Sequence, residues 1–147
     1  MEDRNKLWQA RHDAYYAAIA LRSGCQGWAT DVCVPVSRLA ECINETKDDL
    51  EKTGLISPLV GHVGDGNFHM LYIVDPDNKD EMVKAQEHSD RMVMRALEMG
   101  GTCTGEHGVG YGKIHFLTDE HGDAMSLMRS LKTAFDPDNI MLSLIHI

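Results

Sequence analysis

Gly61-His-Val-Gly-Asp-Gly-Asn-Phe-His69 joins two apolar runs through a short segment of glycine and aspartate. Asp-Gly is favoured at the centre of a two-residue type I′ turn, because both central positions need a positive φ angle. We therefore predict a β-hairpin with Asp65 and Gly66 at its turn and with His62 directly opposite His69. Directly opposed side chains lie about 4.5–5.5 Å apart at Cβ on one face of a sheet. Two imidazoles at that spacing could share a metal ion, or could be ordinary half-buried strand residues.

Helical and extended patterns alternate on both sides of this hairpin. The apolar runs themselves, residues 57–63 and 67–74, are its predicted strands. A β-branched run that ends at a proline predicts a further strand within residues 28–35. Apolar residues at three- and four-residue spacing predict helices over residues 5–22, 37–52, 80–99 and about 118–133. This mixture favours an α+β fold, with helices packed on an antiparallel sheet, over a doubly wound parallel sheet.

The composition indicates one acidic globular domain. The 147 residues are 43% hydrophobic and 25% charged, which provides a core and excludes a disordered or fibrous class. The formal net charge of −9 offers no basic face to a nucleic-acid backbone. No apolar run reaches the roughly 18 residues of a membrane span, and we expect no secretion signal at the start. The four cysteines form no C-x-x-C pair, so we expect reduced thiols in an intracellular protein.

A second segment, Gly101-Thr-Cys-Thr-Gly-Glu-His-Gly-Val-Gly110, offers the anionic ligand that two histidines lack. Catalytic zinc sites commonly use three protein ligands and keep one position open. Glu106 is the best candidate for the third ligand, and it stands beside His107 in a loop rich in glycine. Glycine is favoured where backbone approaches another group closely. The same glycines could instead serve only a tight turn after the long helix.

Together and in this order, the two segments resemble the C-terminal half of FAD-linked D-2-hydroxyacid dehydrogenases. The similarity runs from about Asn5 to Met141. Lys6-Leu-Trp-Gln-Ala-Arg-His12 and Thr30-Asp-Val-Cys-Val-Pro35 are most similar to the mitochondrial D-lactate dehydrogenase branch of that family. The resemblance implies the FAD-linked oxidase C-terminal domain, which binds substrate and metal, and a mitochondrial location. Without the resemblance, the expected location would be cytoplasmic.

The family's metal centre and general base map onto the two segments. The resemblance implies that His62, His69 and Glu106 bind a divalent metal, zinc or manganese, beside the flavin. It also implies that His107 contacts the substrate and is the general base. His107 would take the hydroxyl proton while a hydride passes from the substrate α-carbon to FAD, and a neutral imidazole can accept a proton near pH 7.

Further residues follow from the same resemblance. Arg11 matches a position that pairs with the substrate carboxylate, in keeping with guanidinium–carboxylate geometry. Asn67 and Lys113 are expected to contact FAD. Leu71 stands where the 2-hydroxyglutarate enzymes have asparagine, which favours a short or apolar hydroxy acid such as D-lactate. The expected partners are this small 2-hydroxy acid and an electron acceptor such as cytochrome c or an electron-transfer flavoprotein.

The chain departs from the family pattern at both ends. Residues 1–141 are expected to form the C-terminal domain, and residues 142–147 read as an atypical tail. The N-terminal FAD-binding domain of the family is not found, so we expect a fragment that has no turnover alone and a FAD bound mainly by the missing domain. The alternative is a catalytically inactive metal-binding fragment or interaction module. A zinc hydrolase is less favoured, because no second carboxylate near the motif would activate water.

Overall fold

The computed structural model describes residues 2–141, so the predicted tail over residues 142–147 lies outside the described residues. The first half of the chain forms α1 (Glu2–Ile19), β1 (Gln26–Ala29), β2 (Val32–Cys33), α2 (Leu39–Thr53), β3 (Leu59–His62) and β4 (Asn67–Val74). The second half forms α3 (Lys79–Glu98), α4 (Gly110–Lys113), α5 (Leu117–His121) and α6 (Ala124–Phe135). Short 3-10 turns precede α2 at Val36–Arg38, β4 at Val63–Asp65 and α5 at Ile114–Phe116.

The sheet is built around β4, which pairs antiparallel with each of the other three strands. β1 and β2 keep a single register along β4, with Ala29 opposite Leu71 and Val32 opposite Phe68. They are therefore one strand interrupted at residues 30–31, where the sequence predicted an unbroken one. The helices and the small antiparallel sheet confirm the predicted α+β class.

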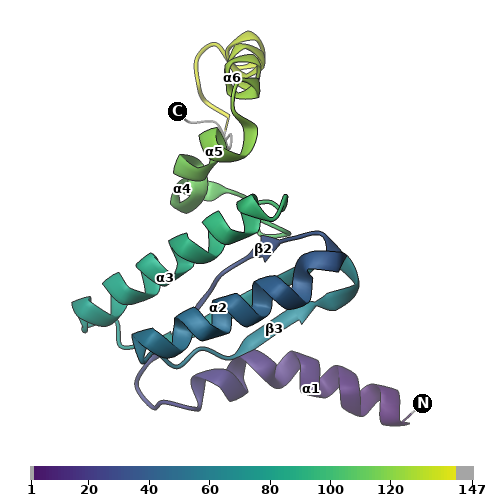
Figure 1. Cartoon of the computed structure of the whole chain (residues 1–147), viewed down its shortest axis with the longest axis vertical. Coiled ribbons are helices and arrows are strands. Elements are labelled where there is room, and N and C mark those ends of the chain that lie inside the picture. Colours follow the sequence, from purple (N-terminus) through teal and green to yellow (C-terminus); the bar gives the residue numbers. More distant parts are fainter. Residues whose placement is uncertain (1, 142–147) are drawn as a thin grey trace.

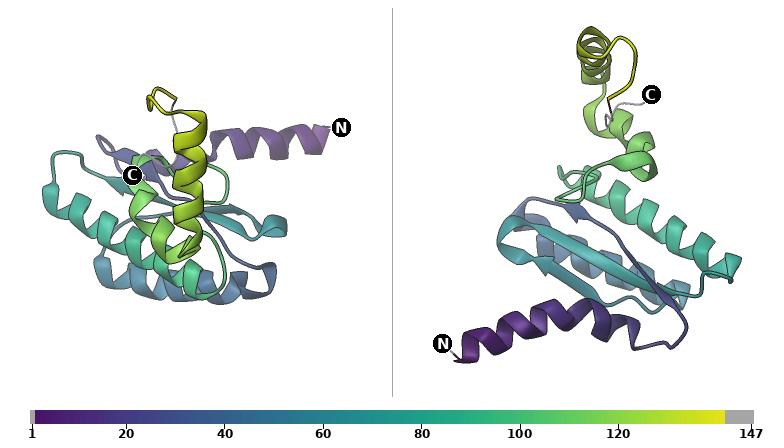
Figure 2. Two further views of the ribbon diagram at one scale, coloured as in Figure 1. Left: turned by 90° about the horizontal axis from the view of Figure 1, so that it is seen from above. Right: turned by 180° about the vertical axis from the view of Figure 1, so that it is seen from behind.

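Helices cover both faces of this sheet (Figures 1 and 2). One face of β4 packs into the main core with α2 and α3 through Phe68, Met70, Tyr72 and Val74. The opposite face packs Leu71 and Ile73 against Ala18, near the end of α1. Because side chains alternate along a strand, Asn67 and His69 share the α1 face with Leu71. The polar end of that face holds the candidate site.

The hairpin between β3 and β4 differs from the predicted two-residue turn. Val63–Asp65 forms a 3-10 turn, and Gly66 follows in the left-handed region with φ 75°. The register then places His62 opposite Asn67, and His69 opposite Val60. The prediction of directly opposed histidines is wrong by two residues. A shift of two keeps both imidazoles on one face, whereas a shift of one would have separated them.

The C-terminal part also differs from the single helix predicted over about residues 118–133. It divides into α5 and α6, with Gly122 at φ 52° between them. The helix predicted over residues 37–52 begins at Leu39, and Ser37 lies inside the 3-10 turn before α2. Within residues 2–141, no helix combines the length and the apolar content that crossing a membrane requires.

Candidate metal centre

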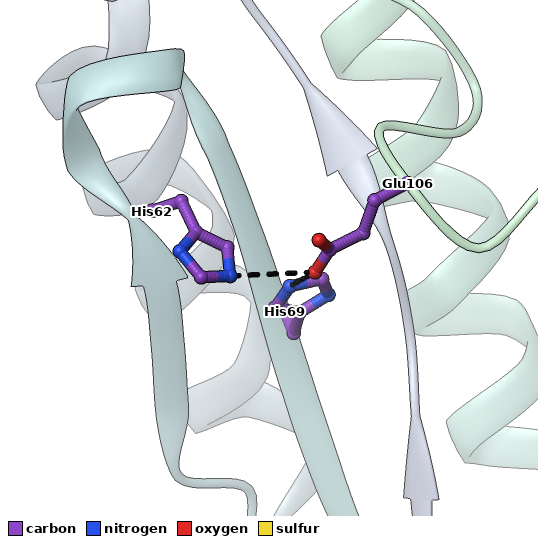
Figure 3. A group of neighbouring side chains, drawn as sticks. All are labelled: His62, His69 and Glu106. Carbon is purple, nitrogen blue, oxygen red and sulfur yellow. Dashed lines mark ion pairs between the residues drawn. The ribbon is translucent and has the colours of Figure 1, made fainter. Parts of the chain in front are cut away.

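Three side chains from two strands and one loop converge on the α1 face of the sheet (Figure 3). His62 ends β3, His69 lies within β4, and Glu106 belongs to the loop after α3. Glu106 Oε1 lies 2.9 Å from His69 Nε2 and 3.5 Å from His62 Nε2. One ligand atom from each residue falls within 4.8 Å of the others, which is the spacing that a single metal ion requires. The structure thus brings together the three residues predicted as ligands.

His69 is oriented by the interruption between β1 and β2. Its Nδ1 lies 2.7 Å from the carbonyl oxygen of Thr30. A carbonyl only accepts hydrogen bonds, so Nδ1 is the donor in this contact, and Nε2 is the ring nitrogen that faces Glu106. A histidine ligand in a metal site commonly donates its other ring N–H to such an acceptor.

Asp31, the other residue of the interruption, holds the loop that carries Glu106. Its Oδ2 accepts hydrogen bonds from the backbone N–H groups of Gly105, Glu106 and His107 at 2.8–2.9 Å. The hydroxyl of Thr104 donates to the same oxygen at 2.7 Å. Burial would raise the pKa of the Asp31 carboxyl, but these donors and the amide of Asn67 outweigh burial and hold that pKa well below its ordinary value. Asp31 is therefore a carboxylate.

Only glycine fits at position 105. A Cβ there would overlap the side-chain amide nitrogen of Asn67 and would lie 3.0 Å from Asp31 Oδ1. The expectation that backbone approaches another group closely in this loop is confirmed at this residue. The alternative, that its glycines serve only a tight turn, does not explain Gly105.

The three candidate ligands form one wall of a cavity of about 580 Å³. Arg11 reaches this cavity from α1, and His107 reaches it from the loop. The His107 ring centroid lies 5.1 Å from that of His69, and its Nε2 lies 3.7 Å from Glu106 Oε1. Leu71 and Val60 contribute apolar wall. The structure therefore places the predicted base, the predicted carboxylate partner and Leu71 around one space.

Asn67 and Lys113, the residues expected to contact FAD, both contact Asp31 and do not line this cavity. Asn67 Nδ2 donates to Asp31 Oδ1 at 2.7 Å and to the carbonyl of Val32 at 3.0 Å. Its Oδ1 is buried and has no hydrogen-bond partner among the described residues. Lys113 Nζ donates to the carbonyl oxygens of Asp31 and Cys103, and burial lowers its pKa. A role for either residue in binding FAD stays a prediction.

Sequence reasoning missed Thr30 and Asp31. Both were included in a run predicted as one continuous strand. A carboxylate among apolar strand residues is the signal that could have marked Asp31, because a buried charge requires partners. Its partners lie 36 and 73–76 positions further along the chain, which no local pattern reveals.

A family model described as FAD linked oxidases, C-terminal domain, matches residues 1–143. The chain belongs to this family, which confirms the resemblance that the two motifs indicated. It is 52% identical over 141 residues to a probable mitochondrial D-lactate dehydrogenase of Danio rerio, covering 95% of this chain and 28% of that protein.

Two further relatives also match 95% of this chain. A mitochondrial D-lactate dehydrogenase (cytochrome) of Arabidopsis thaliana is 42% identical over 95% of this chain and 25% of the relative. A glycolate oxidase subunit of Bacillus subtilis is 36% identical over 95% of this chain and 30% of the relative. The chain thus spans between 25% and 30% of the length of these curated relatives.

Proposed function

We propose that this chain is the substrate- and metal-binding domain of a flavin-dependent dehydrogenase that oxidises D-lactate, or a related short D-2-hydroxy acid, to the 2-keto acid. The observation that carries the proposal is the convergence of three metal-ligand side chains, a further imidazole and a guanidinium on one cavity. The names of the relatives support the substrate class, because lactate and glycolate are both 2-hydroxy acids.

The residues fit a divalent metal, zinc or manganese. His62 Nε2, His69 Nε2 and a carboxylate oxygen of Glu106 would hold it, a nitrogen and oxygen set that leaves a position open. The proton already fixed on His69 Nδ1 supports this fit. When bound, such an ion supplies Lewis-acid charge that lowers the pKa of a substrate hydroxyl.

The cavity residues account for recognition of a short hydroxy acid. The Arg11 guanidinium would pair with the substrate carboxylate. Leu71 and Val60 would contact the substrate methyl group, and this apolar wall disfavours a second carboxylate, whose burial would be unpaired. The imidazole of His107, as the neutral form, would accept the hydroxyl proton.

The proposals on FAD, cellular location and electron acceptor concern the whole protein. FAD, which supplies the hydride acceptor when bound, would be held mainly by a separate flavin-binding domain. We propose a mitochondrial location, because the D-lactate dehydrogenases of Danio rerio and Arabidopsis thaliana are named mitochondrial. Cytochrome c or an electron-transfer flavoprotein would be the electron acceptor, and the name of the Arabidopsis relative supports the first of these.

Substrate binding by the chain itself tests the proposal. The zinc-loaded and the EDTA-treated chain are titrated calorimetrically with D-lactate and with D-2-hydroxyglutarate. We expect D-lactate to bind only the zinc-loaded chain, and more tightly than the dicarboxylate. Equal binding of D-lactate with and without zinc, or no binding in either state, would contradict the proposal.

A metal-binding module without turnover is the second candidate. It is favoured by one observation, namely that the amide nitrogen of Asn67 and the ammonium of Lys113 are engaged in bonds within the chain. Mixing the chain with FAD, D-lactate and an electron-acceptor dye tests the second candidate, and turnover by the chain would exclude it. Zinc binding without any binding of D-lactate would support the second candidate over the first.

A further inference from the structure

The Asp31 carboxylate connects three elements at the back of the candidate metal centre. Its Oδ2 accepts four hydrogen bonds, three of which come from successive backbone N–H groups at residues 105–107. Its Oδ1 accepts a fifth from Asn67, at the start of β4. The side chain of Asp31 is only 3% exposed, so these bonds are shielded from water. Charge-assisted bonds in such surroundings are stronger than neutral ones.

The converging donors belong to the residues that carry the chemistry. Glu106 supplies the carboxylate ligand, and its own backbone N–H donates to Asp31. The next residue, His107, donates in the same way. The exposed fraction of the Glu106 side chain is 48%, so few packing contacts restrain it. Its position beside His69 therefore depends on the backbone that Asp31 fixes.

The same two-residue interruption also orients a second ligand. The carbonyl of Thr30 fixes the ring of His69, while Asp31 fixes the loop of Glu106. Lys113 donates to the backbone carbonyl of Asp31 and so ties the interruption to α4. At the gap between β1 and β2, the backbone N–H of Met70 donates to the Thr30 hydroxyl rather than to the Thr30 carbonyl, which leaves that carbonyl oxygen available to His69.

We propose that Asp31 is a positioning residue for the metal centre, one that acts through Glu106 and rests on the proposed function of that site. An asparagine cannot replace it. An amide has a single acceptor oxygen, and its nitrogen would face donors either at residues 104–107 or at Asn67. The loop would then lose its fixed position even where the fold survives. Partners behind metal ligands typically change metal affinity by about 10- to 100-fold.

A double-mutant cycle on zinc affinity tests this inference. Zinc is titrated into the metal-free full chain against a chelating dye, for the wild type, Asp31→Asn, Glu106→Gln and the double variant. We expect Asp31→Asn to bind zinc about 10- to 100-fold more weakly, and the double variant to bind no more weakly than Glu106→Gln. If Asp31 had a purely structural role, the losses of zinc affinity in the two single variants would instead add in the double variant.

Asp65→Asn is the matched control, because it removes the same charge from the exposed turn near His62 without touching the loop. We expect its zinc affinity to equal that of the wild type. Circular dichroism and urea unfolding of the metal-free chains check that each variant folds. If Asp31→Asn does not fold, the zinc titration is made with Thr104→Val instead. That variant removes one hydrogen-bond donor to Asp31, and we expect it to bind zinc about 3- to 10-fold more weakly.

Two results would overturn the inference while leaving the proposed function standing. One is wild-type zinc affinity in folded Asp31→Asn, or in Thr104→Val if that variant decides. The other is fully additive losses in the double variant. A wild-type chain that binds no zinc would contradict the proposed function itself, and the inference would fall with it.

Discussion

The three candidate ligands meet different surroundings. The side chain of His69 is 9% exposed and is held by Thr30, whereas that of His62 is 38% exposed at the end of β3. Glu106 is held through its backbone rather than its side chain. His69 is therefore the most restrained of the three side chains, whereas those of His62 and Glu106 have more freedom to adjust when a metal binds.

Arg11 offers a direct test of substrate recognition at the residue scale. It lies in the exposed helix α1, with its guanidinium carbon 5.5 Å from the ring centroid of Trp8, and it lines the cavity. We expect Arg11→Ala to weaken D-lactate binding to the zinc-loaded chain by about 10-fold or more, because a charge-assisted bond to the carboxylate is lost. Calorimetric titration measures this loss.

Arg4→Ala is the control for that prediction, since Arg4 is an exposed arginine of the same helix that does not line the cavity. Its D-lactate affinity should match the wild type. Equal losses in both variants would show that α1 contributes only general charge, and no loss in either would contradict the assignment of Arg11.

The residues of the site were more predictable than the residues that support it. His62, His69 and Glu106 were predicted from residue types and spacing in two short motifs. His107 and Arg11 were predicted only from the family resemblance of the segments in which they lie. Asp31 lies in the segment from Thr30 to Pro35, which shows a family resemblance but predicted no role for this residue. Its role exists only because the fold brings residues 104–107 to it, and a long-range contact of that kind is not encoded in local sequence.

At the scale of elements, the hairpin shows that the face of a strand residue is easier to predict than its exact partner on the neighbouring strand. The turn prediction failed because Val63–Asp65 adopts a 3-10 turn before Gly66, which lengthens the connection. The strand period of two was nevertheless enough to place both histidines on one face. Turn geometry depends on tertiary contacts, and here a Cβ at Gly66 would overlap the carbonyl oxygen of Val34.

Substituting the two glycines of this turn tests that account. Gly66→Ala should destabilise the chain by more than about 1 kcal/mol and weaken zinc binding, because its positive φ and its contact with Val34 exclude a side chain. Gly64→Ala should be close to neutral, since a Cβ there meets nothing within 4 Å. Urea unfolding measures both. A larger loss in Gly64→Ala than in Gly66→Ala would contradict the account.

Helix α3 carries a buried histidine outside the site. His88 Nε2 donates to the carbonyl of Thr46 at 3.1 Å, so Nδ1 accepts from the Tyr72 hydroxyl at 2.5 Å. Burial lowers the pKa of His88 below the ordinary value of 6.5. The neutral ring is therefore the form that suits the folded chain.

This lowered pKa predicts how stability depends on pH. Well above pH 6.5 the ring is neutral in both the folded and the unfolded chain, and its contribution to stability is fully present. As the pH falls below that value, the unfolded chain takes up a proton first, so the free energy of unfolding decreases until the folded pKa is passed.

Urea unfolding at about pH 7.5 and about pH 5.5 should show a smaller decrease in the free energy of unfolding for His88→Gln than for the wild type. The exposed-residue control His115→Gln should match the wild type, and an equal decrease in all three would contradict the assignment.

At the scale of the whole molecule, the two faces of β4 have separate tasks. One face packs against α2 and α3 in the main core (Figures 1 and 2), and the other face gives the site His69 and Leu71. The α+β class was predictable because β4 and α3 have strong patterns, and their observed bounds differ from the predicted ones by at most one residue. The split between α5 and α6 was not predictable from the sequence, because one glycine inside a helical pattern is often tolerated.

Metal binding should stabilise the whole fold, because the three ligands join both strands of the hairpin to the loop after α3. A ligand at 100 times its dissociation constant adds about 2.7 kcal/mol of stability. We expect zinc to raise the Tm of the EDTA-treated chain by roughly 5–10 °C. Differential scanning calorimetry measures this shift. The Glu106→Gln chain should respond much less, and an equal response would place the bound zinc elsewhere.

The central claim is that His62, His69 and Glu106 form a metal centre. The most direct measurement is the metal content of the purified, dialysed chain by inductively coupled plasma mass spectrometry. We predict near-stoichiometric zinc or manganese in the wild type and in His115→Ala, which removes an exposed histidine outside the cluster. We predict strong depletion in His62→Ala and in Glu106→Ala. Equal metal content in all four chains, or none in the wild type, would contradict the claim.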